Sequence, residues 1–77
     1  MDTITAIINY FKLNTPDTRD GQDCYWFRKT RDRCERYIGS PYDFDEAFDG
    51  LIADEVLVMR EKQTRSGLIN TYFTLRL

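Results

Sequence analysis

The hydrophobic pattern changes its period once in the C-terminal half of the chain, and this change constrains the fold more than any other feature. From position 44 to position 52, apolar side chains recur at the spacing of one helical face: Phe44, Ala47, Phe48, Leu51 and Ile52. From position 69 onward they alternate, and one face carries Ile69, Thr71, Phe73, Leu75 and Leu77. A period of 3.6 predicts an amphipathic helix, and a period of 2 predicts a half-buried strand. The chain must therefore pass from a helix into a sheet within a few residues.

Two strands are expected after this helix. Residues 56–60 are apolar and β-rich, and a polar turn separates them from residues 68–76. Two such runs around a short turn predict an antiparallel hairpin. The helix itself is expected over residues 44–53, where Asp43 and Glu46 have the spacing of a capping box.

The N-terminal segment predicts a first helix and a loop. One apolar helical stripe is formed by Ile4, Ile7, Ile8 and Phe11. This stripe predicts a helix over residues 3–13, with Asp2 as its N-cap. Residues 14–23 contain Pro, Gly and small polar side chains and no large apolar one, so a loop is expected there.

A second helix is expected over residues 25–38. Its end is marked by Gly39, a typical residue after a helix C-terminus, and by Pro41, which prevents continuation. Its start is less well defined, because the segment CYWF at residues 24–27 also fits a short strand. Both interpretations of this start stay open.

The acidic and basic residues are unevenly distributed. The 77 residues carry 11 Lys and Arg against 13 Asp and Glu, a formal net charge of −2. Residues 1–55 hold 7 of the cations and 12 of the acids, a net of −5, whereas residues 56–77 hold 4 cations and one acid, a net of +3. Because binding surfaces are local, this asymmetry says more about partners than the total does. A chain of this length forms one small domain.

The residue types exclude several classes of site. The chain has no histidine and two cysteines, Cys24 and Cys34, so a zinc site lacks ligands. If one helix holds both thiols, about 15 Å separates them, too far for a disulfide, and reduced thiols indicate an intracellular, cytoplasmic protein. No apolar run approaches the ~18 residues of a membrane span. No nucleophile motif or Gly-rich phosphate loop accompanies the carboxylates, so we expect neither an enzyme nor a bound cofactor.

The block LIADEVLVMREKQTRSGLINTYFTL, residues 51–75, resembles the last helix and wing of winged helix-turn-helix proteins. The segment YIGSPYD, residues 37–43, takes the place of the turn between the second and third helices. The resemblance implies an α+β fold in which three helices precede a two-stranded antiparallel wing. It also implies DNA binding, with the third helix in the major groove and the wing on the phosphates or in the minor groove.

The residues that correspond to the DNA-binding positions divide into two groups. The wing carries Arg60, Lys62 and Arg65 around a flexible tip, which suits contact with phosphates. The third helix instead turns carboxylates outward, those of Asp43, Asp45, Glu46 and Asp49. Base readout relies mainly on Arg, Lys, Asn or Gln, so this helix is not expected to enter the groove. Each group also has a plainer interpretation, as a solvated helix face and as an ordinary polar hairpin tip.

The second helix has a mixed surface. Arg28, Lys29 and Arg31 are candidates for phosphate contact. Asp32 and Glu35 follow two of these cations at i, i+4 spacing and neutralise part of their charge. The cluster is therefore either a solvated face or a surface for phosphate or an acidic partner.

Two functions follow from these expectations. The first is a small regulator or inhibitor that binds a partner protein with a basic surface through the acidic third helix. Small acidic domains of this kind are common in phage and mobile-element genomes, and size and fold rather than particular residues suggest that origin. The second is a DNA-binding regulator of transcription or replication that docks through its wing and second helix. A homodimer, formed through exposed aromatic side chains or the edge of the last strand, is compatible with both.

Overall fold

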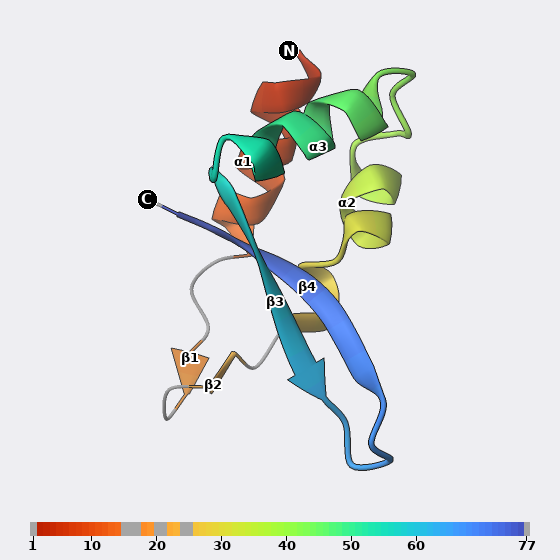
Figure 1. Cartoon of the computed structure of the whole chain (residues 1–77). Helices are drawn as coiled ribbons and strands as arrows, with labels where there is room; N and C mark the ends of the chain where they lie inside the picture. The colour runs from red at the N-terminus through yellow and green to blue at the C-terminus, as the bar shows by residue number, and fades with distance from the viewer. Residues whose placement is uncertain (1, 15–17, 20–21, 24–25, 77) are drawn as a thin grey trace.

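Three α-helices followed by a two-stranded antiparallel sheet make up the computed structural model of the chain (Figure 1), an α+β arrangement consistent with a winged-helix layout. The structure describes residues 2–14, 18–19, 22–23 and 26–76. In chain order its elements are α1 (Thr3–Leu13), β1 (Thr18–Arg19), β2 (Gln22–Asp23), the 3₁₀-helix η1 (Trp26–Arg28), α2 (Arg31–Tyr37), α3 (Phe44–Ala53), β3 (Leu57–Gln63) and β4 (Ile69–Leu75). The expected fold class is confirmed.

Helix α1 has the bounds expected from its apolar stripe. Its N-cap is Asp2, whose carboxylate accepts a hydrogen bond from the backbone N–H of Thr5 at 2.7 Å. Ile7 and Phe11 are fully buried, whereas Ile4 remains 49% exposed. The stripe therefore joins the core along the later turns of α1 and leaves the first turn open to solvent.

Two short strands lie within the loop expected over residues 14–23. Within it, β1 and β2 pair antiparallel with each other. Strands of two residues are too short to leave a periodic pattern in the sequence, so they could not be predicted from it. Residues 15–17, 20–21 and 24–25 lie outside the described part of the chain, and with them Cys24 and the start of the CYWF segment.

The second helix is shorter than the predicted range 25–38, and this corrects that prediction. Helix α2 begins only at Arg31, because Thr30 is extended (φ −92°, ψ 157°) and its hydroxyl accepts a hydrogen bond from the helix N-terminus. Just before it, the carbonyl of Lys29 accepts a hydrogen bond from the backbone N–H of Phe73 at 2.8 Å. The N–H of Arg33, which would close a helical turn on the Lys29 carbonyl, donates to the Thr30 hydroxyl instead, so the helix starts after Thr30.

Helix α3 has the predicted bounds but not the predicted cap. Asp43 is the N-cap residue, yet its side chain makes no capping hydrogen bond to α3. The backbone of Asp43 (φ −95°, ψ 19°) lies outside the extended region that lets a cap side chain reach back to the helix. Its carboxylate instead accepts a hydrogen bond from the hydroxyl of Thr3 at 2.5 Å. The expected capping box is therefore replaced by a bond between α3 and α1.

The hairpin is confirmed, with a longer first strand and a slightly shorter second strand (Ile69–Leu75) than the predicted ranges 56–60 and 68–76. Strand β3 continues to Gln63, beyond the predicted range 56–60. The register pairs Leu57 with Leu75 beside the core and Gln63 with Ile69 near the tip. The polar end of β3 continues as a strand because every residue has a partner across the hairpin, which outweighs the weak β propensity of Glu and Lys.

Aromatic side chains form the centre of the core. Phe48 is fully buried, and its ring centroid lies 6.1 Å from that of Phe11, 5.3 Å from Phe44 and 4.9 Å from Phe73. One ring of α3 thus joins α1 and β4. The other buried apolar residues are Ile7, Tyr10, Cys34, Ala47, Leu51 and Leu57. In the part of the chain that the structure describes, no helix has the length and apolar character needed to cross a membrane.

Candidate protein-binding surface

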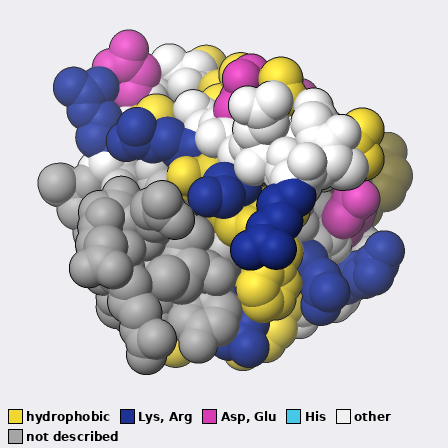
Figure 2. All heavy atoms as spheres, turned by 90° about the horizontal axis from the view of Figure 1, so that it is seen from below, with side chains coloured by type: hydrophobic (Ala, Val, Ile, Leu, Met, Phe, Trp, Pro, Cys, Tyr) yellow, Lys and Arg dark blue, Asp and Glu magenta, His cyan; other side chains and the backbone are white. Residues whose placement is uncertain are grey.

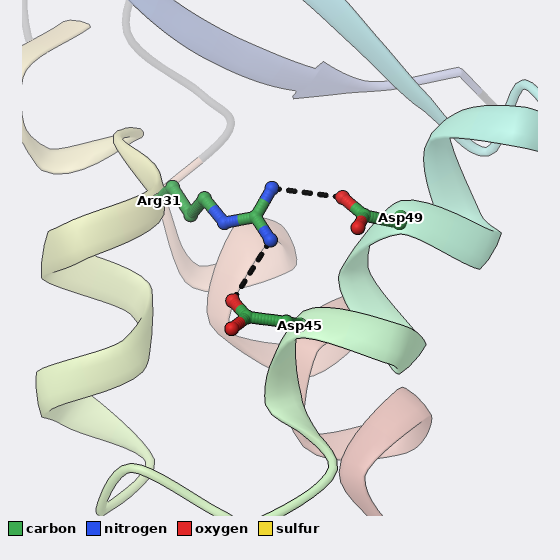
Figure 3. A network of polar contacts seen from close by, with 3 residues as sticks. All are labelled: Arg31, Asp45 and Asp49. Atoms are coloured by element: carbon green, nitrogen blue, oxygen red, sulfur yellow. Dashed lines mark hydrogen bonds and ion pairs between the residues drawn. The ribbon is translucent and has the colours of Figure 1, made fainter.

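The four carboxylates predicted to bind a protein point in two directions from α3. Asp45 and Asp49 face α2 and lie on either side of the Arg31 guanidinium (Figure 3). Nη2 of Arg31 donates to Asp45 at 2.8 Å, and Nη1 donates to Asp49 at 2.9 Å. The side chains of Asp45 and Asp49 remain 79% and 65% exposed. This half of the acidic face already holds a cation from its own chain, so its attraction for a foreign cation is reduced.

Aromatic rings as well as carboxylates hold Arg31 in place. Its guanidinium carbon lies 4.9 Å from the ring centroid of Phe48 and 5.9 Å from that of Phe44. The hydrogen bond to Asp45 is the main cause of the raised pKa of Arg31. The sequence predicted that Arg31 pairs with Glu35 on its own helix. Its guanidinium crosses to α3 instead. A phosphate contact by Arg31 would have to compete with both carboxylates.

The other two carboxylates of α3 face a groove. Asp43 and Glu46, together with Asp2 and Asp54, line an open groove of about 580 Å³ between the first turn of α1 and α3. The rest of its lining is Thr3, Ile4, Ala47, Gly50 and Leu51. Apart from its two chain neighbours and the backbone of α3 itself, no heavy atom lies within 4 Å of the position that a Cβ on Gly50 would occupy. Among the described residues, the groove therefore combines an apolar floor with a rim that is acidic and carries no cation.

The rim carboxylates differ in how far the fold satisfies them. Asp2 caps α1, and its hydrogen bond with the backbone of Thr5 lowers the pKa of Asp2. Asp43 is bonded to the hydroxyl of Thr3. The side chains of Glu46 and Asp54 are exposed and make no hydrogen bond or ion pair with the residues that the structure describes. Glu46 and Asp54 are thus the rim residues best able to attract a cation from outside.

No protein-family model, curated protein or solved structure matches the chain. The chemistry of its surfaces therefore has to indicate what it binds. Within the described residues, no group of three or more Cys, Asp or Glu is placed to hold a metal ion. The groove carboxylates lie along a rim, which suits an extended partner with several contacts better than a single ion.

The wing residues predicted to contact nucleic acid lie on one face of β3, where Lys62 is half-buried, and at the tip of the hairpin. Arg60 and Lys62 are two positions apart on β3, on the face opposite to Leu57. Nε of Arg60 donates to the hydroxyl of Thr74 on β4 at 3.4 Å, and Arg65 is exposed in the turn. Figure 2, which views this end of the molecule, shows more Lys and Arg surface than Asp and Glu surface. A cationic surface at the wing end is compatible with the predicted phosphate contacts.

The three cations predicted around the second helix do not form one surface. Arg28 is exposed in η1. Lys29 is 2% exposed, which corrects its prediction as a phosphate-binding residue, because a phosphate cannot reach a buried side chain. Arg31 is bound to α3. A continuous helix over residues 25–38 would have placed Arg28 and Arg31 one turn apart on the same side, and the break before α2 separates these two.

Two acidic residues of the groove, Asp2 and Asp54, were not among the predicted site residues. Asp54 follows the same face of α3, since positions 43, 46, 50 and 54 are spaced by three or four residues. That spacing separates Asp43, Glu46 and Asp54 from the face of Asp45 and could have been recognised. Asp2 lies on α1, and no sequence pattern indicates that it approaches α3.

Proposed function

We propose that the chain is a small non-enzymatic regulator or inhibitor that binds a basic segment of a partner protein in the groove between α1 and α3. The observation that supports this most is the presence of an apolar floor and an acidic rim in one groove. Ile4, 49% exposed, is available for apolar contact, and Glu46 and Asp54 are available to attract cations. A fitting partner carries Lys or Arg residues on either side of one or two apolar side chains.

The apolar and charged parts of the groove contribute differently. An exposed ion pair contributes about 0.2–1 kcal/mol, whereas full burial of one Leu or Ile side chain contributes about 1.5–3 kcal/mol. The apolar contact therefore supplies most of the affinity. The carboxylates fix the orientation of the segment and speed its association.

The proposed site overlaps only partly with the acidic face predicted from the sequence. Asp43 and Glu46 remain in it, and Asp2 and Asp54 join them. Asp45 and Asp49 contribute less, because Arg31 occupies both. We place this activity inside the cell, which the free thiol of Cys34 supports.

Selection from a random peptide display library tests this proposal. The selected peptides are expected to be enriched in Lys and Arg beside Leu, Ile or Phe. The double variant Glu46→Lys with Asp54→Lys is expected to bind them at least about tenfold more weakly, since like charges now meet across the groove. Its matched control is Asp32→Lys with Glu35→Lys, which makes the same charge change on α2. Selection of acidic peptides, or equal binding by the groove variant and the wild type, would contradict the proposal.

A second candidate function is DNA binding through the wing. It is favoured by the arrangement of Arg60 and Lys62 on one face of β3 with Arg65 at the tip. With Arg28 these make four cations, so the logarithm of the binding constant should fall with the logarithm of salt at a slope of about −3 to −4. A gel shift with duplex DNA at about 50 mM salt tests this function. Absence of any shift there would exclude it, because non-specific binding is strongest at low salt.

A further inference from the structure

The molecule carries complementary chemistry at its two ends. The groove lies at the end formed by α1 and α3, and the hairpin extends to the opposite end (Figure 1) along a longest dimension of 36 Å. We call residues 62–69 the wing tip. It holds Arg65 and Leu68 in the turn, with Lys62 on one face of the hairpin and Ile69 on the other; Leu68 and Ile69 are 67% and 63% exposed. Cations beside exposed apolar side chains are what the groove, with its acidic rim and apolar floor, is suited to bind.

Hydrogen bonds hold the wing tip in one shape. The N–H of Thr64 donates to the carbonyl of Leu68 at 2.8 Å, and the N–H of Gly67 donates to the carbonyl of Thr64 at 3.0 Å. Gly67 has φ +86°, a conformation that glycine adopts without steric cost. The hydroxyls of Thr64 and Ser66 also lie 2.9 Å apart in a hydrogen bond. Because the turn is already ordered, little conformational entropy is lost when it docks.

We propose that the wing tip of one copy docks into the groove of a second copy. The tip and the groove of the same chain lie at opposite ends, so the contact forms only between molecules. Such a contact is heterologous, since different surfaces of the two copies meet, and each copy keeps one free tip or groove for further growth. The proposal uses the groove of the proposed function but needs no foreign partner. Its consequence is that the wing tip competes with a basic partner for the groove.

Charge favours this pairing over symmetric ones. A contact between two wing tips places Arg65 and Lys62 against their own copies. A contact between two grooves places Glu46 and Asp54 against theirs. Like charges that meet at an interface oppose association, whereas the wing tip in the groove pairs opposite charges.

Light scattering on the purified full chain, over a range of concentrations, tests the proposal. At about 50 mM salt the average mass is expected to rise with concentration, and at about 500 mM salt it should fall towards that of the monomer, because salt screens exposed charges. Two double variants are expected to associate at least about tenfold more weakly than the wild type: Glu46→Lys with Asp54→Lys, and Lys62→Glu with Arg65→Glu. Mixed in equal amounts, the two variants should associate again, since each reversed surface then finds its opposite.

Two matched variants on α2 control for net charge: Asp32→Lys with Glu35→Lys, and Arg33→Glu with Arg36→Glu. Both should associate like the wild type. Far-UV circular dichroism checks the fold of every variant, and Glu46→Gln with Asp54→Asn replaces a groove variant that does not fold.

Three results would overturn the proposal. They are a monomer at every concentration at low salt, association that neither reversal weakens, and a mixture of reversed variants that stays monomeric. A monomer that still selects basic peptides would overturn self-association and leave the proposed function standing.

Discussion

The guanidinium of Arg31 donates to the carboxylate of Asp45 at 2.8 Å, across 14 positions of the sequence. This bond joins the first residue of α2 to the exposed face of α3. A helix of seven residues is not stable alone, so α2 depends on contacts of this kind with the rest of the fold. It also means that one residue predicted to bind nucleic acid and one predicted to bind protein are bound to each other.

Replacing Arg31 by Ala is expected to lower the free energy of unfolding by about 1–2 kcal/mol. Two exposed ion pairs contribute about 0.2–1 kcal/mol each, and the cation–π contact with Phe48 contributes about 0.5–1 kcal/mol. Arg31→Lys should recover only part of this, because an ammonium group cannot bridge two carboxylates as a planar guanidinium does. Urea denaturation measures the change, and Arg33→Ala is the control, since Arg33 is exposed on the same helix. A cost no larger than that of the control would show that the bridge does not stabilise the fold.

The elements that could be predicted are those in which the hydrophobic pattern alone decides the structure. The stripes of α1 and α3 predicted their bounds, because each helix buries one continuous face against the core. The hairpin was predicted for the same reason, and only the length of β3 was underestimated. There the pattern ends at Arg60, but the pairing across the hairpin continues to Gln63.

The elements that could not be predicted depend on contacts between distant residues. Helix α2 starts after the extended Thr30, next to the bond between Lys29 and Phe73, and no local pattern indicates that bond. The outward direction of the α3 carboxylates was predicted. Their pairing with Arg31 was not, because Glu35 on the same helix as Arg31 was an equally good partner in the sequence. The groove forms where α1 approaches α3, and no sequence pattern indicates this approach. Only the rim carboxylates on α3 could therefore be recognised from the sequence.

Two glycines are expected to respond in opposite directions to replacement by Ala. Gly50→Ala should raise the free energy of unfolding by about 0.5–1 kcal/mol, because alanine is the better helix former and the added methyl group meets no atom within 4 Å. Gly39→Ala should lower it by about 1–2 kcal/mol, since φ at Gly39 is +88° and there is no comparable gain in helix propensity. Thermal unfolding of both variants measures the two signs. A loss of stability in Gly50→Ala would contradict the free space above that residue.

The Gly50 variant also tests the groove. Its added methyl group lies in the groove floor, so peptides selected by the wild type should bind it more weakly although the fold is more stable. Gly39 lies outside the groove lining, and peptide binding by folded Gly39→Ala should match that of the wild type. Equal peptide affinity of Gly50→Ala and wild type would place the binding site elsewhere.

Phe48→Ala is expected to lower the free energy of unfolding by about 3–5 kcal/mol. Phe48 is fully buried, and it contacts rings from α1, α3 and β4. A domain of this size has a stability of only a few kcal/mol, so the variant should be largely unfolded at room temperature. Phe48→Leu, which keeps most of the volume, should remain folded with a lower denaturation midpoint. Circular dichroism distinguishes the two, and a folded Phe48→Ala would show that the core does not depend on this ring.

The buried thiol of Cys34 is expected to make the fold less stable in alkali. Burial raises the pKa of Cys34 from its ordinary value of 9.0 to about 12. An acid whose pKa is higher in the folded state stabilises the fold below the unfolded pKa, and this contribution is lost as the pH rises from about 9 towards 12. The expected slope is up to about 1.4 kcal/mol per pH unit in that window, which makes about 1 kcal/mol between pH 8 and pH 10.

Urea denaturation at these two pH values, in a Cys24→Ser background that leaves one thiol, measures this loss. The matched variant also carries Cys34→Ala, which is less stable at both pH values but should lose less stability between them. Burial also raises the pKa of Tyr10, whose effect begins near pH 10 and is present in both proteins. Because Cys34 also contributes to the raised pKa of Tyr10, the difference between the two pH dependences reports the thiol together with this coupling. If both proteins lose the same stability between pH 8 and pH 10, Cys34 ionises as readily in the folded chain as in the unfolded one.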